Sequence, residues 1–286
     1  MTDEQRLEQD IKTIARWIVR CEHIVAFTGA GISTDSGIPD FRGPKGVWTR
    51  RDAGLPAPRW RVSPGLVKPN ASHLSLVELQ GLGKLQLLIT QNTDNLHRRS
   101  GIRPELLAEL HGNGQLVRCL GCERQYTREE VGWATDRWGA GYRTQKPLAG
   151  QPACAACGGR LISSVVNFGD PLPHKELALA GQHARQCDLM LVLGSSLRVE
   201  PAASLVGLAL MSGARVVLAN QGKTPYDEGA TLRAWAGIGE VIPPAVERVK
   251  RVLGGVAEQG LSVGQGLPRL PWGRRCTAEE GTGTSS

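Results

Sequence analysis

The apolar positions of this chain follow two periods, one typical of helices and one typical of buried strands. Near the start they recur every three or four residues, at Leu7, Ile11, Ile14 and Ile18. This spacing places them on one face of a helix, so we expect an amphipathic helix over residues 4–20. The next apolar run, Ile24–Phe27, is short and leads into glycine, which predicts a strand that enters a tight turn.

Further short apolar runs predict strands, and helical spacing is found between some of them. The expected strands are Leu85–Thr90, Leu161–Phe168, Leu189–Leu193 and Arg215–Ala219, and the expected helices are His73–Leu79 and Ala202–Met211. Residues 40–70 are rich in Pro, Gly and Arg without a sustained period, which predicts a long loop. Strands that alternate with helices predict an α/β fold with a Rossmann-like, doubly wound parallel sheet.

Four of the seven cysteines stand in two Cys-x-x-Cys pairs with glycines close by. The pairs are Cys119/Cys122 and Cys154/Cys157. Two such pairs allow four thiolates to converge on one tetrahedral Zn²⁺, and glycine permits the tight turns around the metal. Four sulfur ligands leave no open coordination position, so we expect a structural zinc ion, one per chain. Buried free thiols or redox pairs are the alternatives.

Glycine and polar residues follow three of the expected strands. Gly29-Ala30-Gly31 follows the first, Gly194-Ser195-Ser196 follows Leu189–Leu193, and Asn220 follows Arg215–Ala219. Parallel strands end at one sheet edge, where glycine turns let backbone N–H groups approach a diphosphate and an amide can bind a ribose hydroxyl. Thr34 replaces the third glycine of the usual fingerprint, and a plain strand-to-helix turn is the alternative. The three strand ends together favour a dinucleotide site.

The cysteine pairs interrupt the alternating pattern, which indicates a smaller zinc-binding domain inserted into the larger one. The expected parts are a discontinuous nucleotide-binding domain (1–41, 84–117 and 161–253), a loop and helical module (42–83) and a zinc-binding module (118–160). From Gly254 the chain is Gly-rich and polar, so we expect a disordered tail over 254–286.

The charge and the apolar runs restrict the partners. The net charge is +7, but the basic residues form isolated pairs and no block, so solvated surface charge is favoured over a nucleic-acid face. No apolar run approaches the roughly 20 residues that cross a bilayer, and the polar first residues are unlike a secretory signal. We therefore expect a cytoplasmic protein without a membrane partner and with no nucleic acid as direct substrate.

Several longer motifs occur in a fixed order along residues 10–250. They are GAGISTDSGIPDFRGPKGVW (29–48), TQNTDNLH (90–97), ELHGN (109–113), the two cysteine pairs, VVNFGD (165–170), GSSLRVEPA (194–202) and LANQG (218–222). In these motifs the chain resembles the sirtuin family of NAD-dependent protein deacylases. The FRGPKGVWT segment with Trp48 is most similar to the branch usually called class IV.

The resemblance implies a set of binding residues. Those for NAD would be Gly29, Ala30, Gly31, Ser33, Ile38, Asp40, Phe41, Arg42, Trp48, Gln91, Asn92, Asp94, Gly194, Ser195, Ser196, Asn220, Gln221 and Ile238. Those for the substrate peptide would be Val166, Phe168, Gly169 and Val199. The peptide would add as a strand between two loops, held mainly by main-chain hydrogen bonds.

The resemblance also implies the chemistry, in which an acylated lysine, NAD and water yield nicotinamide, free lysine and O-acyl-ADP-ribose. His111 would act as the base on a ribose hydroxyl, a task that suits imidazole because its unperturbed pKa lies near neutrality. Asn92 and Asp94 would complete the catalytic set. No Ala-Tyr-x-x-Arg motif for acidic acyl groups is present in the sequence, which favours acetyl or a longer neutral acyl chain.

Two positions depart from the family pattern, and three other functions stay open. Thr93 stands where an aliphatic residue is frequent, and Asp170 where glutamate is common; neither change removes a required donor or acceptor. Mono-ADP-ribosyl transfer to a protein would use the same motifs. A non-catalytic NAD or ADP-ribose sensor would need no base at His111, and a nucleic-acid-binding module would use the cysteine knuckles and the basic charge.

Overall fold

The computed structural model describes residues 1–258, and its centre is a six-stranded parallel sheet. The strands are β1 (Ile24–Thr28), β2 (Leu85–Thr90), β3 (Leu107–Glu109), β7 (Leu189–Leu193), β8 (Arg215–Ala219) and β9 (Leu232–Ala234). Their order across the sheet is β3-β2-β1-β7-β8-β9, which is the doubly wound order of dinucleotide-binding domains. The chain order reverses between β1 and β7. The expected fold class is confirmed.

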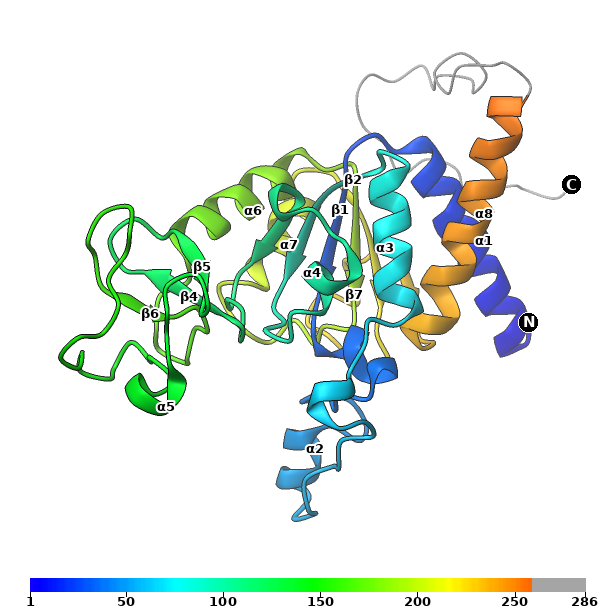
Figure 1. The fold of residues 1–286 in the computed structure, drawn as a ribbon. Coiled ribbons are helices and arrows are strands. Elements are labelled where there is room, and N and C mark those ends of the chain that lie inside the picture. Colours follow the sequence, from blue (N-terminus) through cyan, green and yellow to red (C-terminus); the bar gives the residue numbers. More distant parts are fainter. Residues whose placement is uncertain (259–286) are drawn as a thin grey trace, which may run out of the picture.

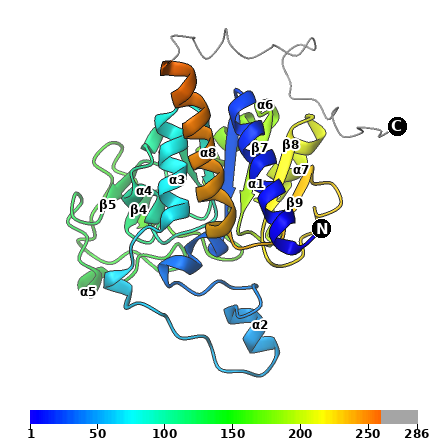
Figure 2. The ribbon, with the colours of Figure 1, turned by 90° about the vertical axis from the view of Figure 1, so that its right-hand side faces the viewer.

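Helices cover both faces of the sheet (Figures 1 and 2). One face carries α1 (Asp3–Arg20), α3 (Ala71–Gly81) and α8 (Ile238–Glu258), and the other carries α6 (His174–Gln186) and α7 (Ser204–Met211). Strands β1 and β7 are buried along their whole length, because their side chains meet an apolar helix layer on either side. This explains why these strands are continuous apolar runs in the sequence.

Helix α1 shows how local sequence and packing agree. Thr2 and Gln5 form a capping box, in which the Thr2 hydroxyl accepts from the Gln5 backbone N–H and the Gln5 side chain accepts from the Thr2 backbone N–H. The predicted face is buried at Ile11, Ile14 and Ile18, while Leu7 packs partly buried against the same core. The helix contacts α8 along this face.

A second sheet lies to one side of the main one, on the left in Figure 1. It contains β4 (Leu116–Cys119), β5 (Gln125–Thr127) and β6 (Leu161–Ser163), all antiparallel in the order β5-β4-β6, with the short helix α5 (Thr135–Trp138) nearby. Its small core contains Val117, Trp133, Trp138 and Leu161. The sheet therefore extends a few residues beyond the expected limits of 118 and 160.

The predicted strand over Leu161–Phe168 is wrong in two respects. Only Leu161–Ser163 is a strand, and it pairs with β4 in the small antiparallel sheet instead of the main one. Residues 164–168 form a loop, in which the Val166 N–H donates to the His111 carbonyl at 3.0 Å. An apolar run of this length does not tell a strand from an extended loop whose side chains line a cavity.

The larger elements of the main domain that were not predicted are β3, α6, β9 and α8. Helix α8 contains Pro243 and Pro244, which normally end a helix, but its buried face holds it in place: Val241, Ile242, Ala245, Val246 and Val249. It continues to Glu258, past Gly254 where the tail was expected to begin. The rest of the expected tail, 259–286, lies outside the described residues.

The loop expected over 40–70 contains two short helices, α2 (Val47–Asp52) and a 3-10 turn (Pro64–Leu66). This loop projects beyond the end of the main sheet, at the bottom of Figure 1. The remaining elements are α4 (Leu96–Ser100) and the 3-10 turns Ala30–Ser36 and Pro104–Leu106. Within residues 1–258, no helix combines the length and apolarity needed to span a bilayer.

Candidate active site

A cavity of about 1420 Å³ opens at the carboxyl ends of β1, β2, β7 and β8. Its walls come from the ends of these strands, from the loop that carries α2, and from residues 165–172 after the small sheet. The reversal of chain order between β1 and β7 is where doubly wound sheets bind ligands. The volume exceeds that of a typical single-ligand pocket, so the cavity has room for more than one bound molecule.

Two glycine turns form the floor of the cavity and touch each other. The Gly31 N–H donates to the Gly194 carbonyl at 2.9 Å, and the Gly29 N–H donates to the Leu193 carbonyl at 3.0 Å. A Cβ on Gly29 would lie 2.9 Å from the Cα of Ser195. Gly194 has a φ of +67°, a conformation that side chains rarely adopt. Glycine is therefore required for the close approach of the two turns.

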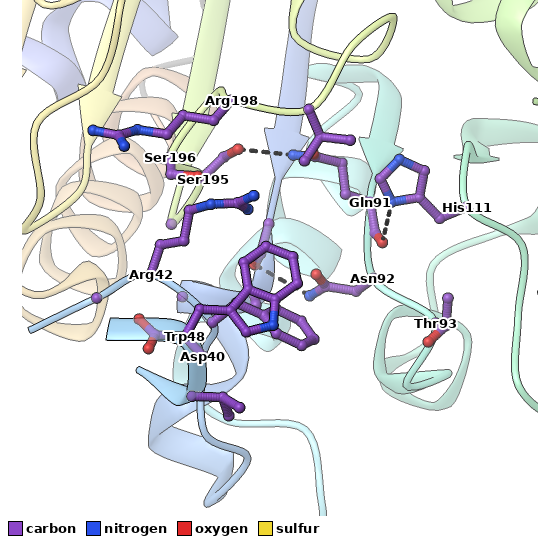
Figure 3. A pocket seen from close by; sticks show the side chains of 18 of the residues that line it. Asp40, Arg42, Trp48, Gln91, Asn92, Thr93, His111, Ser195, Ser196 and Arg198 are labelled. Carbon is purple, nitrogen blue, oxygen red and sulfur yellow. Dashed lines mark hydrogen bonds between the residues drawn. The ribbon is translucent and has the colours of Figure 1, made fainter. Parts of the chain in front are cut away.

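The imidazole of His111 stands on the cavity wall, after β3 (Figure 3). Its Nδ1 lies 3.0 Å from the Gln91 carbonyl oxygen. Since a carbonyl can only accept, Nδ1 carries the proton, and in the neutral ring Nε2 is left with its lone pair. Burial lowers the pKa of His111, although the hydrogen bond to Gln91 opposes this shift. Nε2 is therefore the ring nitrogen that is available to accept a proton.

A compact polar network joins the first glycine turn to the loop after β2. The Ser33 hydroxyl donates to the Asp94 carboxylate at 2.7 Å, and the Asn92 side chain donates to the Gly29 carbonyl at 3.2 Å. The Asp94 carboxylate also accepts from the Leu96 backbone N–H at 2.9 Å. These bonds fix the side chains of Asn92 and Asp94 beside the turn. Across from them, burial raises the pKa of Asp40, although a backbone N–H at Gly43 opposes the shift.

Aromatic side chains form the outer wall of the cavity. The Arg42 guanidinium lies 4.0 Å from the centre of the Trp48 ring, which is a cation–π contact. Trp48 also contacts Phe41 and Phe168, with ring centres 5.0 and 6.1 Å away. Phe168 is 80% exposed. These rings give an apolar lining to the side of the cavity that opens to solvent.

The other end of the cavity is lined by polar groups from the β2, β7 and β8 ends. The Gln91 side chain donates to the Ser195 hydroxyl at 2.8 Å (Figure 3). The same hydroxyl accepts from the Leu197 backbone N–H at 3.2 Å, and the Asn220 amide donates to the Gly222 carbonyl at 2.8 Å. The site therefore has a polar part and an aromatic part, and Gln91 links the polar part to His111.

Comparison with known proteins gives the family. A sequence description of the Sir2 family matches residues 29–59 and 57–201. The chain is 38% identical over 249 residues to an NAD-dependent protein deacetylase of Thermodesulfovibrio yellowstonii, in a match that covers 82% of this chain and 93% of the relative. This chain belongs to the Sir2 family.

Two further similarities describe how far the likeness extends. The chain is 37% identical over 241 residues to the deacetylase SRT1 of Arabidopsis thaliana; the match covers 84% of this chain and 49% of that relative, so the chain spans about half of its length. A solved Sir2 structure with a p53 peptide and NAD⁺ superposes with a TM-score of 0.60 and 34% identity, over 88% of this chain and 99% of that one.

The four paired cysteines of this Sir2 family member meet at one point. The four sulfur atoms lie within 4.8 Å of one another, and two of the separations are 3.5 Å (Cys119–Cys157) and 3.7 Å (Cys122–Cys154). A tetrahedron with Zn–S bonds of about 2.3 Å has sulfur–sulfur edges of about 3.8 Å. The donor set and its spacing therefore fit one zinc ion.

Most residues expected from the Sir2 resemblance line the cavity. They are Gly29, Ala30, Gly31, Ser33, Ile38, Asp40, Phe41, Arg42, Trp48, Gln91, Asn92, Asp94, His111, Val166, Phe168, Gly169, Gly194, Ser195, Ser196, Val199 and Asn220. Gln221 and Ile238 do not line it. Gln221 is exposed on the turn after β8, and Ile238 is 8% exposed and packs in the core at the start of α8. Their assignment as NAD contacts therefore stays a prediction.

The cavity also contains residues that the sequence did not single out. Arg198 lies inside the GSSLRVEPA motif and lines the cavity near Arg42 (Figure 3), where its charge adds to burial in lowering the pKa of Arg42. Trp60, half exposed, comes from the Pro-rich loop. Because Arg198 stands in a motif that follows a strand, the sequence could have indicated it as a site residue. The sequence around Trp60 does not predict the direction of its side chain, so this residue could not have been found.

Proposed function

We propose that this chain is an NAD-dependent protein-lysine deacylase that acts on acetyl or longer neutral acyl groups. The products are nicotinamide, free lysine and O-acyl-ADP-ribose. The observation that carries the proposal is the imidazole of His111, held at its Nδ1 by the Gln91 carbonyl and set in one cavity with two glycine turns. A pure binding protein needs no oriented base in this position.

The dinucleotide lies along the carboxyl edge of the sheet. The turns at Gly29–Gly31 and Gly194–Ser196 let its diphosphate approach the backbone closely, and Arg42 pairs with the same charge. The N–H groups of Gly29, Gly31 and Gly194 already donate to carbonyls of the sheet and the turns, so other N–H groups of the turns face the ligand. Ser195 and Asn220 bind the adenosine half. The bond between nicotinamide and ribose supplies the energy of the reaction, and Asp40 and Phe41 surround that end of the molecule.

His111 takes the proton of a ribose hydroxyl at its Nε2, because Nδ1 is already committed to Gln91. Asn92 and Asp94 orient the ribose and the amide of nicotinamide. Their positions are set by the bonds to Gly29 and Ser33, so they need little rearrangement when the ligand enters. These three residues are the catalytic set of the proposal.

The acylated lysine enters from the aromatic end. The peptide adds as a strand between the loop of Val166, Phe168 and Gly169 and the loop of Val199, and main-chain hydrogen bonds carry most of the contact. Phe168 and Trp48 lie on this side of the cavity and offer an apolar surface to the acyl chain. The partners of the chain are thus acylated lysines in proteins, and we propose that it acts in the cytoplasm.

The zinc ion would be held by Cys119, Cys122, Cys154 and Cys157 and would stabilise the small sheet without a role in the reaction. We propose three parts for the chain: the discontinuous nucleotide-binding domain, the loop and helical module over 42–83, and the zinc-binding module. The zinc-binding module includes the paired strands 116–119 and 161–163.

The test combines acyl-lysine peptides of graded chain length with NAD, and mass spectrometry of the products. We expect O-acyl-ADP-ribose and free lysine in equal amounts. His111→Tyr should abolish turnover and keep most NAD binding, while His174→Tyr, at an exposed position outside the cavity, should leave both unchanged. If ADP-ribosylated protein forms without O-acyl-ADP-ribose, the activity is ADP-ribosyl transfer and the proposed deacylation is wrong. Full turnover in His111→Tyr would refute the role of His111 as the base.

A further inference from the structure

A buried arginine holds the loop that follows β8. Arg233, on β9, has a side chain that is only 10% exposed. Its Nη2 donates to the Gly222 carbonyl at 2.7 Å, and its Nη1 donates to the carbonyls of Leu218 at 3.3 Å and Ala234 at 2.6 Å. Three main-chain carbonyls on two strands and one loop therefore converge on a single guanidinium.

The guanidinium is itself fixed on its remaining sides. Its Nε donates to the Asp227 carboxylate at 3.1 Å, and its central carbon, Cζ, lies 3.8 Å from the centre of the Trp235 ring. Asp227 accepts from the Thr224 hydroxyl at 2.7 Å and from the Thr224 N–H at 3.2 Å. Burial is the largest influence and lowers the pKa of Arg233, and the Asp227 carboxylate opposes it. The planar fork of arginine matches these acceptors, whereas a lysine ammonium cannot reach all four.

The Gly222 carbonyl in turn fixes the direction of the Asn220 amide. The Asn220 Nδ2 donates to this oxygen at 2.8 Å. A carbonyl oxygen can only accept, so the NH₂ group must face Gly222 and cannot exchange places with Oδ1. Asn220 lines the cavity, and the bond to Gly222 leaves its Oδ1 available to a ligand as an acceptor. An acceptor binds a hydroxyl group and disfavours a phosphate, which offers acceptors of its own.

Charge near this loop does not provide the same selection. Lys223 follows Gly222 in the chain and also lines the cavity, and a cation would attract an additional phosphate on the ligand. The charge of this loop would favour a phosphorylated ribose, whereas the fixed direction of the Asn220 amide would oppose it.

We propose that Arg233 is a positioning residue that sets the dinucleotide specificity of this site. Through the Gly222 carbonyl it keeps Asn220 Oδ1 directed at the adenosine ribose, so that NAD, with free ribose hydroxyls, is bound and NADP, with a 2′-phosphate, is rejected. The inference rests on the proposed function, because it assumes that the adenosine half lies at the β8 end. Arg233 is outside the cavity lining and acts through its neighbours.

The experiment measures the dissociation constants of NAD and NADP by calorimetry, without any turnover. A site built to bind a hydroxyl rejects a ligand that lacks it by about 10⁴–10⁵, and attraction of the 2′-phosphate to Lys223 offsets part of this. The wild type should therefore bind NAD at least about 100-fold more tightly than NADP. Arg233→Lys should weaken NAD binding about tenfold and NADP binding less, so that the ratio falls toward about 10. Arg215→Lys is the matched control, since Arg215 also stacks on a tryptophan, Trp17, at the opposite end of β8.

The ratio separates positioning from a structural role. A variant that only loosens the fold would weaken both ligands equally, and an unchanged ratio in Arg233→Lys overturns the proposal. If that variant does not fold, Thr224→Val removes the hydroxyl that holds Asp227 and should lower the ratio to a smaller extent; an unchanged ratio there is equally negative. A wild type that binds neither NAD nor NADP overturns the proposed function itself. This result is distinct from an unchanged ratio in either variant.

Discussion

The contact between the two glycine turns gives the most direct test of the dinucleotide floor. In Gly194→Ala, the added Cβ would lie 2.6 Å from the Gly31 carbonyl carbon and 2.7 Å from the Gly31 Cα. Carbon atoms prefer separations of about 3.5–4.0 Å, so the turns must separate by roughly 1 Å. The separation would also lengthen the hydrogen bond from the Gly31 N–H to the Gly194 carbonyl.

The expected free energy has two parts, and the chain offers a control that isolates one of them. An alanine in the left-handed conformation costs roughly 1–2 kcal/mol. Gly83 has nearly the same conformation, with a φ of +69° against +67° for Gly194, but a Cβ added to Gly83 would meet no atom within 4 Å. Gly83→Ala should therefore cost only this first part. Gly194→Ala adds overpacking of about 1–3 kcal/mol and a weakened hydrogen bond worth about 1 kcal/mol.

Urea unfolding and calorimetry with ADP-ribose measure both consequences. We expect a loss of about 1–2 kcal/mol for Gly83→Ala and about 3–6 kcal/mol for Gly194→Ala. Binding of ADP-ribose should weaken at least about tenfold in Gly194→Ala, because a displacement near 1 Å misaligns the N–H groups, and should be unchanged in Gly83→Ala. Equal losses of stability in the two variants, with equal affinities, would refute the close-contact argument.

Three other predictions concern pH and the metal. Burial lowers the pKa of His73 to about 4, so between pH 6.5 and 4 the unfolded chain binds a proton at this residue and the folded state does not. The free energy of unfolding should therefore fall by up to about 3 kcal/mol as pH drops from 6.5 toward 4. In urea titrations, His73→Gln should reduce this dependence of stability on pH. Because burial lowers the pKa of His111, the acid limb of kcat/KM should have its midpoint below pH 6.5, and a midpoint above that value contradicts the assigned base. Cys154→Ser should release zinc and change the fluorescence of Trp133, since a structural zinc contributes roughly 10 kcal/mol to its module. The control Cys276→Ser should retain the zinc and the fluorescence of the wild type. Zinc retained in Cys154→Ser would contradict the site.

Local sequence was sufficient to predict those features that depend on the apolar pattern or the residue spacing within a short segment. The runs Ile24–Phe27, Leu85–Thr90, Leu189–Leu193 and Arg215–Ala219 are strands of the main sheet, because a strand covered on both faces must be apolar throughout. The two cysteine pairs converge, since their spacing leaves few other arrangements. The polar residues that follow these strands come together in one cavity, because parallel strands end at one edge.

Elements that are stabilised by residues far away in the chain could not be predicted from their own sequence. The first turn of α6 is held by Glu123 of the small sheet region, whose carboxylate accepts from the N–H groups of His174 and Lys175 at 2.9 and 3.0 Å. Helix α8 continues through Pro243 because its apolar face is buried against α1 and α3. In both cases the stabilising contact comes from residues outside the helix, so the sequence of the helix does not reveal it.

The amino-acid pattern alone thus determined β1, β2, β7 and β8, the cysteine cluster and the group of side chains at the strand ends, since each follows from periodicity or spacing within a short segment. Tertiary structure decided that β6 joins the small sheet, that Ile238 packs in the core, and that Arg233 reaches the Gly222 carbonyl. These outcomes depend on which surfaces meet after folding, and a contact between segments far apart in the chain leaves no local periodicity to detect.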